Sequence, residues 1–380
     1  MRVLLTGAAG FIGSAVAEAL RACGHEVVAV DVLIPEAHHA AAPAPEGLHL
    51  LDVRSAGEWA HLLCGVDVVC HQAAMVGAGV DVADLPSYAS HNDLGTAALL
   101  AAMAGAGVDR LVLASSMVVY GEGRYVCSQH GEQRPQPRTP EALDRGDFDH
   151  VCARCGRALT WAAVGEDTAF DPRSSYAASK VAQEHYGGAW TRQAPGASIA
   201  LRYHNVYGPG MPRDTPYSGV AAIFRSAVEA GRAPEVFEDG RQMRDFVHVA
   251  DVARANVLAV EAVAQHPVGQ QRAYNVCSGH PVSILEVARS LAAAGPADDD
   301  ATGGTGLDPV VSGRYRPGDV RHVVASADRA RSELGFAAEV PPGPGLREFA
   351  RAPLRPALTS PTTAGAVRRA RNRAGGGDRA

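Results

Sequence analysis

The stretch MRVLLTGAAGFIGSAVAEALRACGHEVVAVD, residues 1–31, decides the fold of this chain. Residues 3–6 are a short apolar run typical of a buried strand, residues 11–23 have the pattern of a helix closed by Gly24, and residues 26–30 are a second apolar run. Further apolar runs at 66–71 and 111–115 alternate with helical patterns such as 94–106. This alternation predicts an α/β fold with a doubly wound parallel sheet.

The turn between the first strand and the first helix is rich in glycine. It contains Gly7, Gly10 and Gly13, with Phe11 and Ile12 just before the last of them. Glycine permits a tight turn, lets the backbone approach a pyrophosphate, and lets the helix pack closely on the sheet, while the helix N-terminus offers free N–H groups to phosphate. The turn therefore predicts a dinucleotide site in a Rossmann sheet.

The end of the second strand indicates which dinucleotide is bound. Asp31 follows the turn by about 20 residues, the position from which a carboxylate accepts hydrogen bonds from both ribose hydroxyls. The same charge would repel the 2′-phosphate of NADP, and the next residue, Val32, supplies no compensating guanidinium. We expect NAD to be preferred over NADP.

A second group of residues suggests acid–base chemistry. Tyr176 and Lys180 are four residues apart and share one face of a predicted helix over 176–192. An ammonium group and a positively charged nicotinamide would both favour the phenolate of Tyr176, which could then act as a base. Ser116 places a hydroxyl at the carboxyl end of the strand 111–115, where such folds bind ligands.

Taken together, the motifs resemble those of extended short-chain dehydrogenase/reductases, in the NAD-dependent epimerase/dehydratase family, over roughly residues 2–336. They are, in order, GAAGFIG at 7–13, HQAA at 71–74, SSMVVYG at 115–121, YAASK at 176–180, LRYHNVYGPG at 201–210, RDFVHVADVA at 244–253, YNVCSG at 274–279 and RYRPGD at 314–319.

The resemblance implies roles for individual residues. It implies that Ser116, Tyr176 and Lys180 are catalytic, with the serine binding the reacting hydroxyl. Asp52 and Val53 match the pair that contacts adenine, and Ala73 and Asn92 match positions lining the cofactor. The positions that grip the nucleotide diphosphate of a sugar substrate are matched by Asn205, Arg244 and Arg316. Family members share an oxidation by NAD, and the resemblance also implies a homodimer.

The reaction is narrowed by the two residues after Ser116. A 4,6-dehydratase of this family carries an Asp-Glu pair there, and a decarboxylase of the UDP-glucuronate type also needs a carboxylate nearby, whereas this chain has Met117 and Val118. The resemblance therefore favours a nucleotide-sugar 4-epimerase of the dTDP-L-rhamnose or UDP-glucose/galactose type. A keto-sugar reductase, a 4,6-dehydratase and a non-catalytic NAD-binding regulator stay open as alternatives.

Residues 122–172 break the alternation and resemble an insertion with no clear strand or helix period. Cys127 and His130 form one potential ligand pair, and Cys152 and Cys155 form another, each separated by two residues. Three thiolates and one imidazole complete a tetrahedral zinc site with no open position, and Gly156 permits the turn that directs N–H groups at sulfur. We expect a structural zinc ribbon, with incidental thiols in a loop as the alternative.

The remaining features define domains and exclude partners. We expect a Rossmann domain over 1–203, a smaller substrate-binding domain over 204–350 with segments that return to the first, a polar loop at 295–308, and a disordered basic tail over 351–380 with seven arginines and one aspartate. The net charge of −6 argues against nucleic acid as the main partner. No apolar run reaches membrane-spanning length and no secretory signal is visible, so we expect a cytoplasmic protein.

Overall fold

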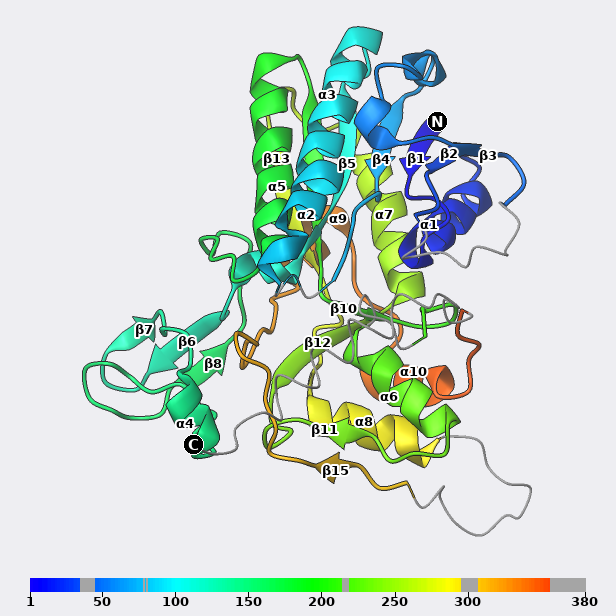
Figure 1. The fold of residues 1–380 in the computed structure, drawn as a ribbon. Helices are drawn as coiled ribbons and strands as arrows, with labels where there is room; N and C mark the ends of the chain where they lie inside the picture. The colour runs from blue at the N-terminus through cyan, green and yellow to red at the C-terminus, as the bar shows by residue number, and fades with distance from the viewer. Residues whose placement is uncertain (35–44, 78, 80, 214–218, 295–306, 356–380) are drawn as a thin grey trace.

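A parallel sheet of seven strands organises the chain, for which the computed structural model describes residues 1–34, 45–77, 79, 81–213, 219–294 and 307–355 (Figure 1). Every neighbouring pair in the sheet is parallel. Because the chain runs outward from β1 in both directions, the sheet is doubly wound and its ligand crevice lies at the carboxyl ends of the strands. The strand order is β13 (Gln271–Val276), β9 (Ala197–Tyr203), β5 (Arg110–Ser116), β4 (Val68–His71), β1 (Arg2–Thr6), β2 (Glu26–Asp31) and β3 (Leu48–Leu50).

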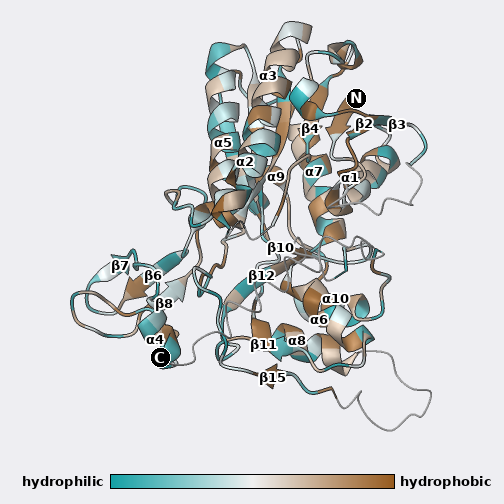
Figure 2. Cartoon of the chain, viewed as in Figure 1, coloured by the Kyte–Doolittle hydropathy of each residue, from teal (hydrophilic) through white to brown (hydrophobic). Residues whose placement is uncertain are grey.

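Helices cover both faces of this sheet. The helices α1 (Phe11–Ala22) and α7 (Val249–Val263) pack on one face, and α3 (Gly95–Ala106) and α5 (Ser175–Gln193) pack on the other. The strands are apolar on both sides because both faces are buried, as expected for a parallel sheet (Figure 2). The strands and helices expected at 3–6, 11–23, 26–30, 66–71, 94–106, 111–115 and 176–192 all occur, with ends that differ by one or two residues.

The second half of the chain forms a smaller α/β region below the sheet in Figure 1. One small sheet orders β10 (Asn205–Tyr207), β12 (Met243–His248) and β14 (Pro281–Ser283), and a second pairs β11 (Glu235–Val236) with β15 (Val310–Val311). The helices α6 (Val220–Glu229), α8 (Ile284–Ala293) and α10 (Pro342–Phe349) enclose a separate apolar core with them. In contrast, β13, α7 and α9 (Asp328–Leu334) pack with the large sheet.

The insertion contains more regular structure than its sequence suggests. The antiparallel strands β7 (Gly131–Gln133), β6 (Arg124–Cys127) and β8 (Thr160–Ala162) form a sheet beside the helix α4 (Pro140–Asp144), and the unit projects from the body in Figure 1. Its apolar core is small and includes Cys127 and Cys152. Strands of three or four residues are too short to give a readable alternation, which explains why the sequence of this segment shows no clear period.

The C-terminal boundary of the fold differs from the expected one. The sequence predicts a disordered tail from residue 351, but Ala352 and Leu354 are buried against the smaller core and the Gly210 N–H donates to the Pro353 carbonyl. Residues 356–380 and most of the loop predicted at 295–308 lie outside the described residues.

Short helical segments complete the described fold. They are η1 (Val53–Ser55), η2 (Ala60–Leu63), η3 (Val82–Asp84), α2 (Leu85–Tyr88), η4 (Ala89–Leu94) and η5 (Met117–Tyr120).

Candidate active site

The glycine-rich turn has the geometry that a pyrophosphate requires. Gly7 has a φ of +68°, and a Cβ at that position would lie 2.6 Å from the Ala73 nitrogen. A Cβ on Gly13 would lie 1.9 Å from the Gly7 carbonyl oxygen, so side chains are excluded at both positions. Gly10 is the N-cap of α1 and provides no capping side chain, which leaves the N–H groups of the first turn, at Phe11 and Ile12, available to an anion.

Asp31 lies at the end of β2 beside this turn. Its carboxylate accepts hydrogen bonds from the Ala9 N–H at 3.0 Å and the Leu33 N–H at 2.9 Å, and its side chain is buried. These contacts hold the carboxylate against the crevice at the carboxyl edge of the sheet. The position fits the ribose-binding role expected of it, and Val32 points outward with 43% of its surface exposed.

The four residues matched to the adenine and cofactor positions lie along the same edge. Asp52 forms an ion pair with Arg54, which keeps the pKa of this carboxyl low. Val53 packs against Gly95, and the Ala73 N–H donates to the Thr6 hydroxyl at 3.2 Å. Asn92 is fully buried and its side chain bonds Met75 and Ser179, so it fastens the segment after β4 onto α5.

Ser116, Tyr176 and Lys180 are brought together where β5 meets α5. The Ser174 hydroxyl caps α5 by accepting the Ala177 N–H, which places Tyr176 in the first helical turn. Ser116 lies close enough to Tyr176 to lower the pKa of its phenol, and the Lys180 Nζ lies 5.9 Å from the centre of the phenol ring. The ammonium group is buried and donates to the Ala114 carbonyl at 3.0 Å.

Burial dominates the ionisation of this pair. It raises the pKa of Tyr176 above its usual range, against a smaller lowering by the nearby Ser116 hydroxyl. It also lowers the pKa of Lys180 to about 7, which the carboxylate of Glu184 partly opposes. Burial therefore favours the neutral form of both groups when the protein residues act alone.

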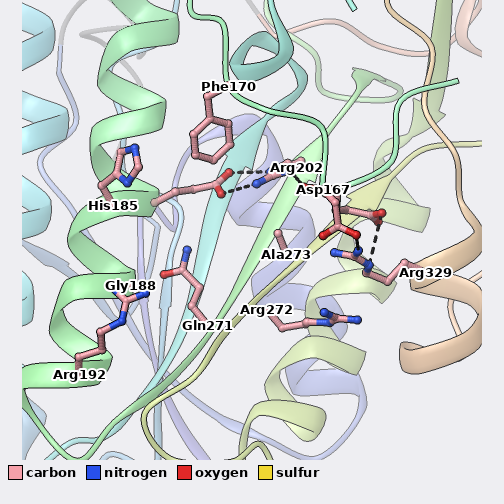
Figure 3. Close-up of a pocket in the computed structure, with 12 residues that line it drawn as sticks. Asp167, Phe170, His185, Gly188, Arg192, Arg202, Gln271, Arg272, Ala273 and Arg329 are labelled. Carbon is pink, nitrogen blue, oxygen red and sulfur yellow. Dashed lines mark hydrogen bonds and ion pairs between the residues drawn. The ribbon is translucent and has the colours of Figure 1, made fainter. Parts of the chain in front are cut away.

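A buried ion pair that we did not predict supports β5 and α5, which carry the predicted catalytic residues (Figure 3). The guanidinium of Arg202 on β9 donates to both carboxylate oxygens of Glu184, at 2.9 and 2.8 Å. The Ser115 hydroxyl also donates to Glu184, and the Tyr120 hydroxyl accepts from Arg202. Glu184 follows Lys180 by one helical turn, so the pair links α5, β5 and β9 directly behind the catalytic residues.

The three predicted diphosphate residues occupy neighbouring segments with different environments. Asn205 on β10 lies next to β12, which carries Arg244, and its buried Oδ1 has no hydrogen-bond partner among the described residues. Arg244 is buried and donates to the carbonyls of Met243, Val320 and Arg321, so it orders the segment that follows Arg316. Arg316 is exposed, with its guanidinium 5.3 Å from the Phe237 ring centre.

The insertion brings its four predicted ligands to one point. The Cys127 Sγ lies 3.7 Å from the Cys155 Sγ and 3.7 Å from the His130 Nδ1, and the Cys152 Sγ lies 3.4 Å from the same nitrogen. All four potential ligand atoms lie within 4.8 Å of one another. Gly156 adopts the left-handed conformation, with a φ of +69°.

The fold and the site define an NAD-type Rossmann enzyme in which Ser116, Tyr176 and Lys180 lie together at the carboxyl edge of the sheet. Residues 3–277 match the model of the NAD dependent epimerase/dehydratase family, and the chain belongs to that family. Among curated relatives, the dTDP-L-rhamnose 4-epimerase of Burkholderia thailandensis is 33% identical over 88% of this chain and 90% of the relative. The UDP-glucose 4-epimerase of Mycolicibacterium smegmatis is 32% identical over 91% of this chain and 96% of the relative.

Solved structures agree with this assignment. The Thermus thermophilus UDP-glucose 4-epimerase in complex with NAD is 31% identical and superposes with a TM-score of 0.70, covering 92% of this chain and 98% of that one. The MoeE5 structure with UDP-glucuronic acid and NAD is 30% identical and superposes with a TM-score of 0.68, covering 92% of this chain and 99% of that one. Within the described residues, no helix is both long and apolar enough to cross a membrane.

Proposed function

We propose that this chain is an NAD-dependent nucleotide-sugar 4-epimerase. The observation that carries the proposal is the chemistry of η5, which follows Ser116 with Met117 and Val118, neither of which can transfer a proton. Tyr176 is then the acid–base group next to Ser116, which suffices for epimerisation but not for loss of water or of a carboxylate. The two curated relatives named above are both 4-epimerases, which supports the same conclusion.

The residues divide the work of the reaction. The turn of Gly7, Gly10 and Gly13, together with Asp31, would hold NAD, which would supply reversible hydride transfer at C4 of the sugar, with return of the hydride to the opposite face. The Ser116 hydroxyl would orient the C4 hydroxyl, and Tyr176 would take its proton and later give it back. Lys180, held by the Ala114 carbonyl, would stabilise the negative charge that develops on the phenol oxygen.

The substrate that we infer is a dTDP- or UDP-linked hexose. Asn205 supports a ligand on this side because its buried carbonyl oxygen lacks a partner among the described residues, and a buried unpaired polar group costs about 1–3 kcal/mol. The backbone ordered by Arg244 carries the exposed guanidinium of Arg316, and guanidinium groups suit the geometry of a diphosphate.

Incubation with candidate substrates, without added cofactor, tests the proposal. The purified protein is incubated separately with dTDP-L-rhamnose, UDP-glucose and UDP-galactose, and the products are resolved by chromatography and NMR. We expect one sugar to convert to its C4 epimer with no net consumption of NAD, and Tyr176→Phe to abolish conversion while retaining NAD. Consumption of added NADH with a keto sugar, or formation of a 4-keto-6-deoxy product, would overturn the proposal.

We also propose that Cys127, His130, Cys152 and Cys155 bind a structural zinc ion. A tetrahedral zinc with bonds of about 2.3 Å to sulfur and about 2.0 Å to nitrogen places its ligand atoms roughly 3.5–3.8 Å apart. The measured separations of 3.4 and 3.7 Å support such a site. The small apolar core of the insertion supports it too, because metal binding can supply folding energy that such a core lacks.

Metal analysis tests the zinc proposal. We expect about one zinc per chain in the purified protein, and loss of that zinc in Cys152→Ser. Cys64→Ser is the matched control, because Cys64 is an exposed free thiol away from the cluster. Zinc-free wild-type protein, or equal zinc in Cys152→Ser and wild type, would exclude the site.

We further infer a cytoplasmic homodimer. None of the seven cysteines, all of them among the described residues, forms a disulfide, which supports a reducing compartment. The elements α2, η4 and α5 pack side by side, and each carries an exposed large side chain: Leu85, Leu94 and Tyr186 respectively. We infer that these side chains form one apolar surface for the dimer. Light scattering tests the dimer: Leu94→Arg should give a monomer with an unchanged far-UV spectrum, whereas a wild-type monomer would refute it.

A further inference from the structure

Arg355 reaches the cofactor turn from the opposite end of the chain. Its Nη1 donates to the Ala9 carbonyl at 2.7 Å, and its Nη2 donates to the Gly10 carbonyl at 3.1 Å and the Ser14 hydroxyl at 2.8 Å. These three groups belong to the glycine-rich turn and the first turn of α1. One guanidinium therefore spans the segment whose N–H groups face the pyrophosphate.

The backbone before Arg355 is fixed independently of these contacts. The Arg355 N–H donates to the Met211 carbonyl at 3.1 Å, and the Gly210 N–H donates to the Pro353 carbonyl at 2.9 Å. Arg225, itself buried, donates to the carbonyls of Phe349 and Ala352. Because the backbone from Phe349 to Arg355 is hydrogen-bonded to the smaller region, the fold of that region places the guanidinium against the turn.

The electrostatic environment of Arg355 favours an anion. The N-terminus of α1 carries a partial positive charge, so a cation placed beside it is unfavourable unless negative charge is close. In the described part of the chain, no carboxylate lies within ion-pair distance of this guanidinium, although Asp31 attracts it from farther away. Burial lowers the pKa of Arg355, which indicates the same incomplete compensation.

We propose that Arg355 is a positioning residue for the turn that binds the pyrophosphate of NAD. It fixes the carbonyls of Ala9 and Gly10, so the N–H groups that follow at Phe11 and Ile12 are held toward the phosphates. It also adds a positive charge beside the part of the turn where the two phosphate charges would gather. The dinucleotide site is thus assembled from both ends of the chain, with the C-terminal segment locking the turn.

Cofactor affinity, measured without any sugar, tests this proposal separately from the epimerase activity. NAD-stripped wild type, Arg355→Ala, Arg355→Lys and Arg351→Ala are titrated calorimetrically with NAD, with ADP-ribose and with adenosine. Arg351 is the matched control, because it lies in the same segment but donates to the Ala294 carbonyl away from the turn. Thermal midpoints without ligand report whether the segment remains docked.

Because Arg355→Ala removes the charge-assisted hydrogen bonds that hold the turn, we expect NAD and ADP-ribose to bind this variant about 10- to 100-fold more weakly than wild type. Adenosine, which has no pyrophosphate, should bind as it does to wild type, and Arg355→Lys should recover part of the affinity and keep its salt dependence. Arg351→Ala should bind NAD within about twofold of wild type. Equal NAD affinity in Arg355→Ala and Arg351→Ala would overturn the proposal, as would an equal loss for adenosine.

Discussion

The ion pair of Glu184 and Arg202 makes a quantitative prediction about how the catalytic helix is held. The Glu184→Gln substitution keeps the shape of the side chain and removes its charge. Glu184 is 3% exposed and Arg202 is 4% exposed, so the guanidinium would be left in the interior without its anion. The Ser115 hydroxyl, which donates to this carboxylate beside Ser116, would also lose a charged acceptor.

Breaking a buried pair by removing one partner costs about 3–5 kcal/mol, because the remaining charge stays desolvated. For a chain of this size, we expect the thermal midpoint of Glu184→Gln to fall by roughly 4–6 °C. The exposed pair of Arg124 and Glu132 provides the control, since Glu132→Gln should cost about 1 kcal/mol or less.

A double-mutant cycle shows whether the cost comes from the pair itself. Glu184→Gln, Arg202→Met and the double variant are unfolded in urea, and we expect a coupling free energy of about 2 kcal/mol or more, since removal of the second charge relieves the first. Single effects that add within about 0.5 kcal/mol would refute the reasoning, as would a midpoint for Glu184→Gln equal to that of Glu132→Gln.

Three other substitutions test the site. The pKa of Lys180 is about 7 in the folded protein and about 10.4 in the unfolded chain, so the unfolded state binds more protons between these pH values. The stability of NAD-free wild type should therefore rise relative to that of Lys180→Met as the pH rises from 7 to 10. A difference in thermal midpoint that does not change with pH would contradict this prediction. Gly13→Ala should abolish NAD retention, since its Cβ would meet the Gly7 carbonyl, whereas Gly105→Ala, with open space around it, should retain NAD and stabilise α3 by about 0.5–1 kcal/mol. Asp31→Asn should narrow the preference for NAD over NADP by about tenfold in direct binding, and an unchanged ratio would show that another group sets the choice.

Local patterns in the sequence were sufficient for most of the fold. Strands buried on both faces are continuous apolar runs, and helices covering them have a 3.6-residue period, so β1, α1 and β2 were predictable almost to the residue. Tyr176 and Lys180 were predictable for the same reason, because four residues separate neighbours on one helix face.

Contacts set by tertiary packing were not predictable in this way. Arg355 and Ala9 are 346 residues apart in the chain, and nothing near either residue indicates that they meet. Glu184 could have been noticed one helical turn after Lys180, but its partner on β9 depends on strand order. The pKa of Tyr176 also depends on burial, which no residue spacing specifies.

Buried charged residues help to fix the position of the insertion. Arg321 is fully buried and donates to Asp149 of the insertion and to Glu238 and Asp239 of the smaller region, while its own N–H donates to Glu122. Such pairs are directional and fix one orientation, although each costs desolvation.

The carbonyl of Arg321 accepts from Arg244, and the next N–H, from His322, donates to the Tyr125 hydroxyl on β6. The strand that ends at Cys127 is therefore joined through one short segment to the arginine predicted to serve the substrate. An insertion with a small core can orient that segment only if its own strands are held rigid. The four clustered side chains that we propose to bind zinc, near the end of β6, are in the right place to provide that rigidity.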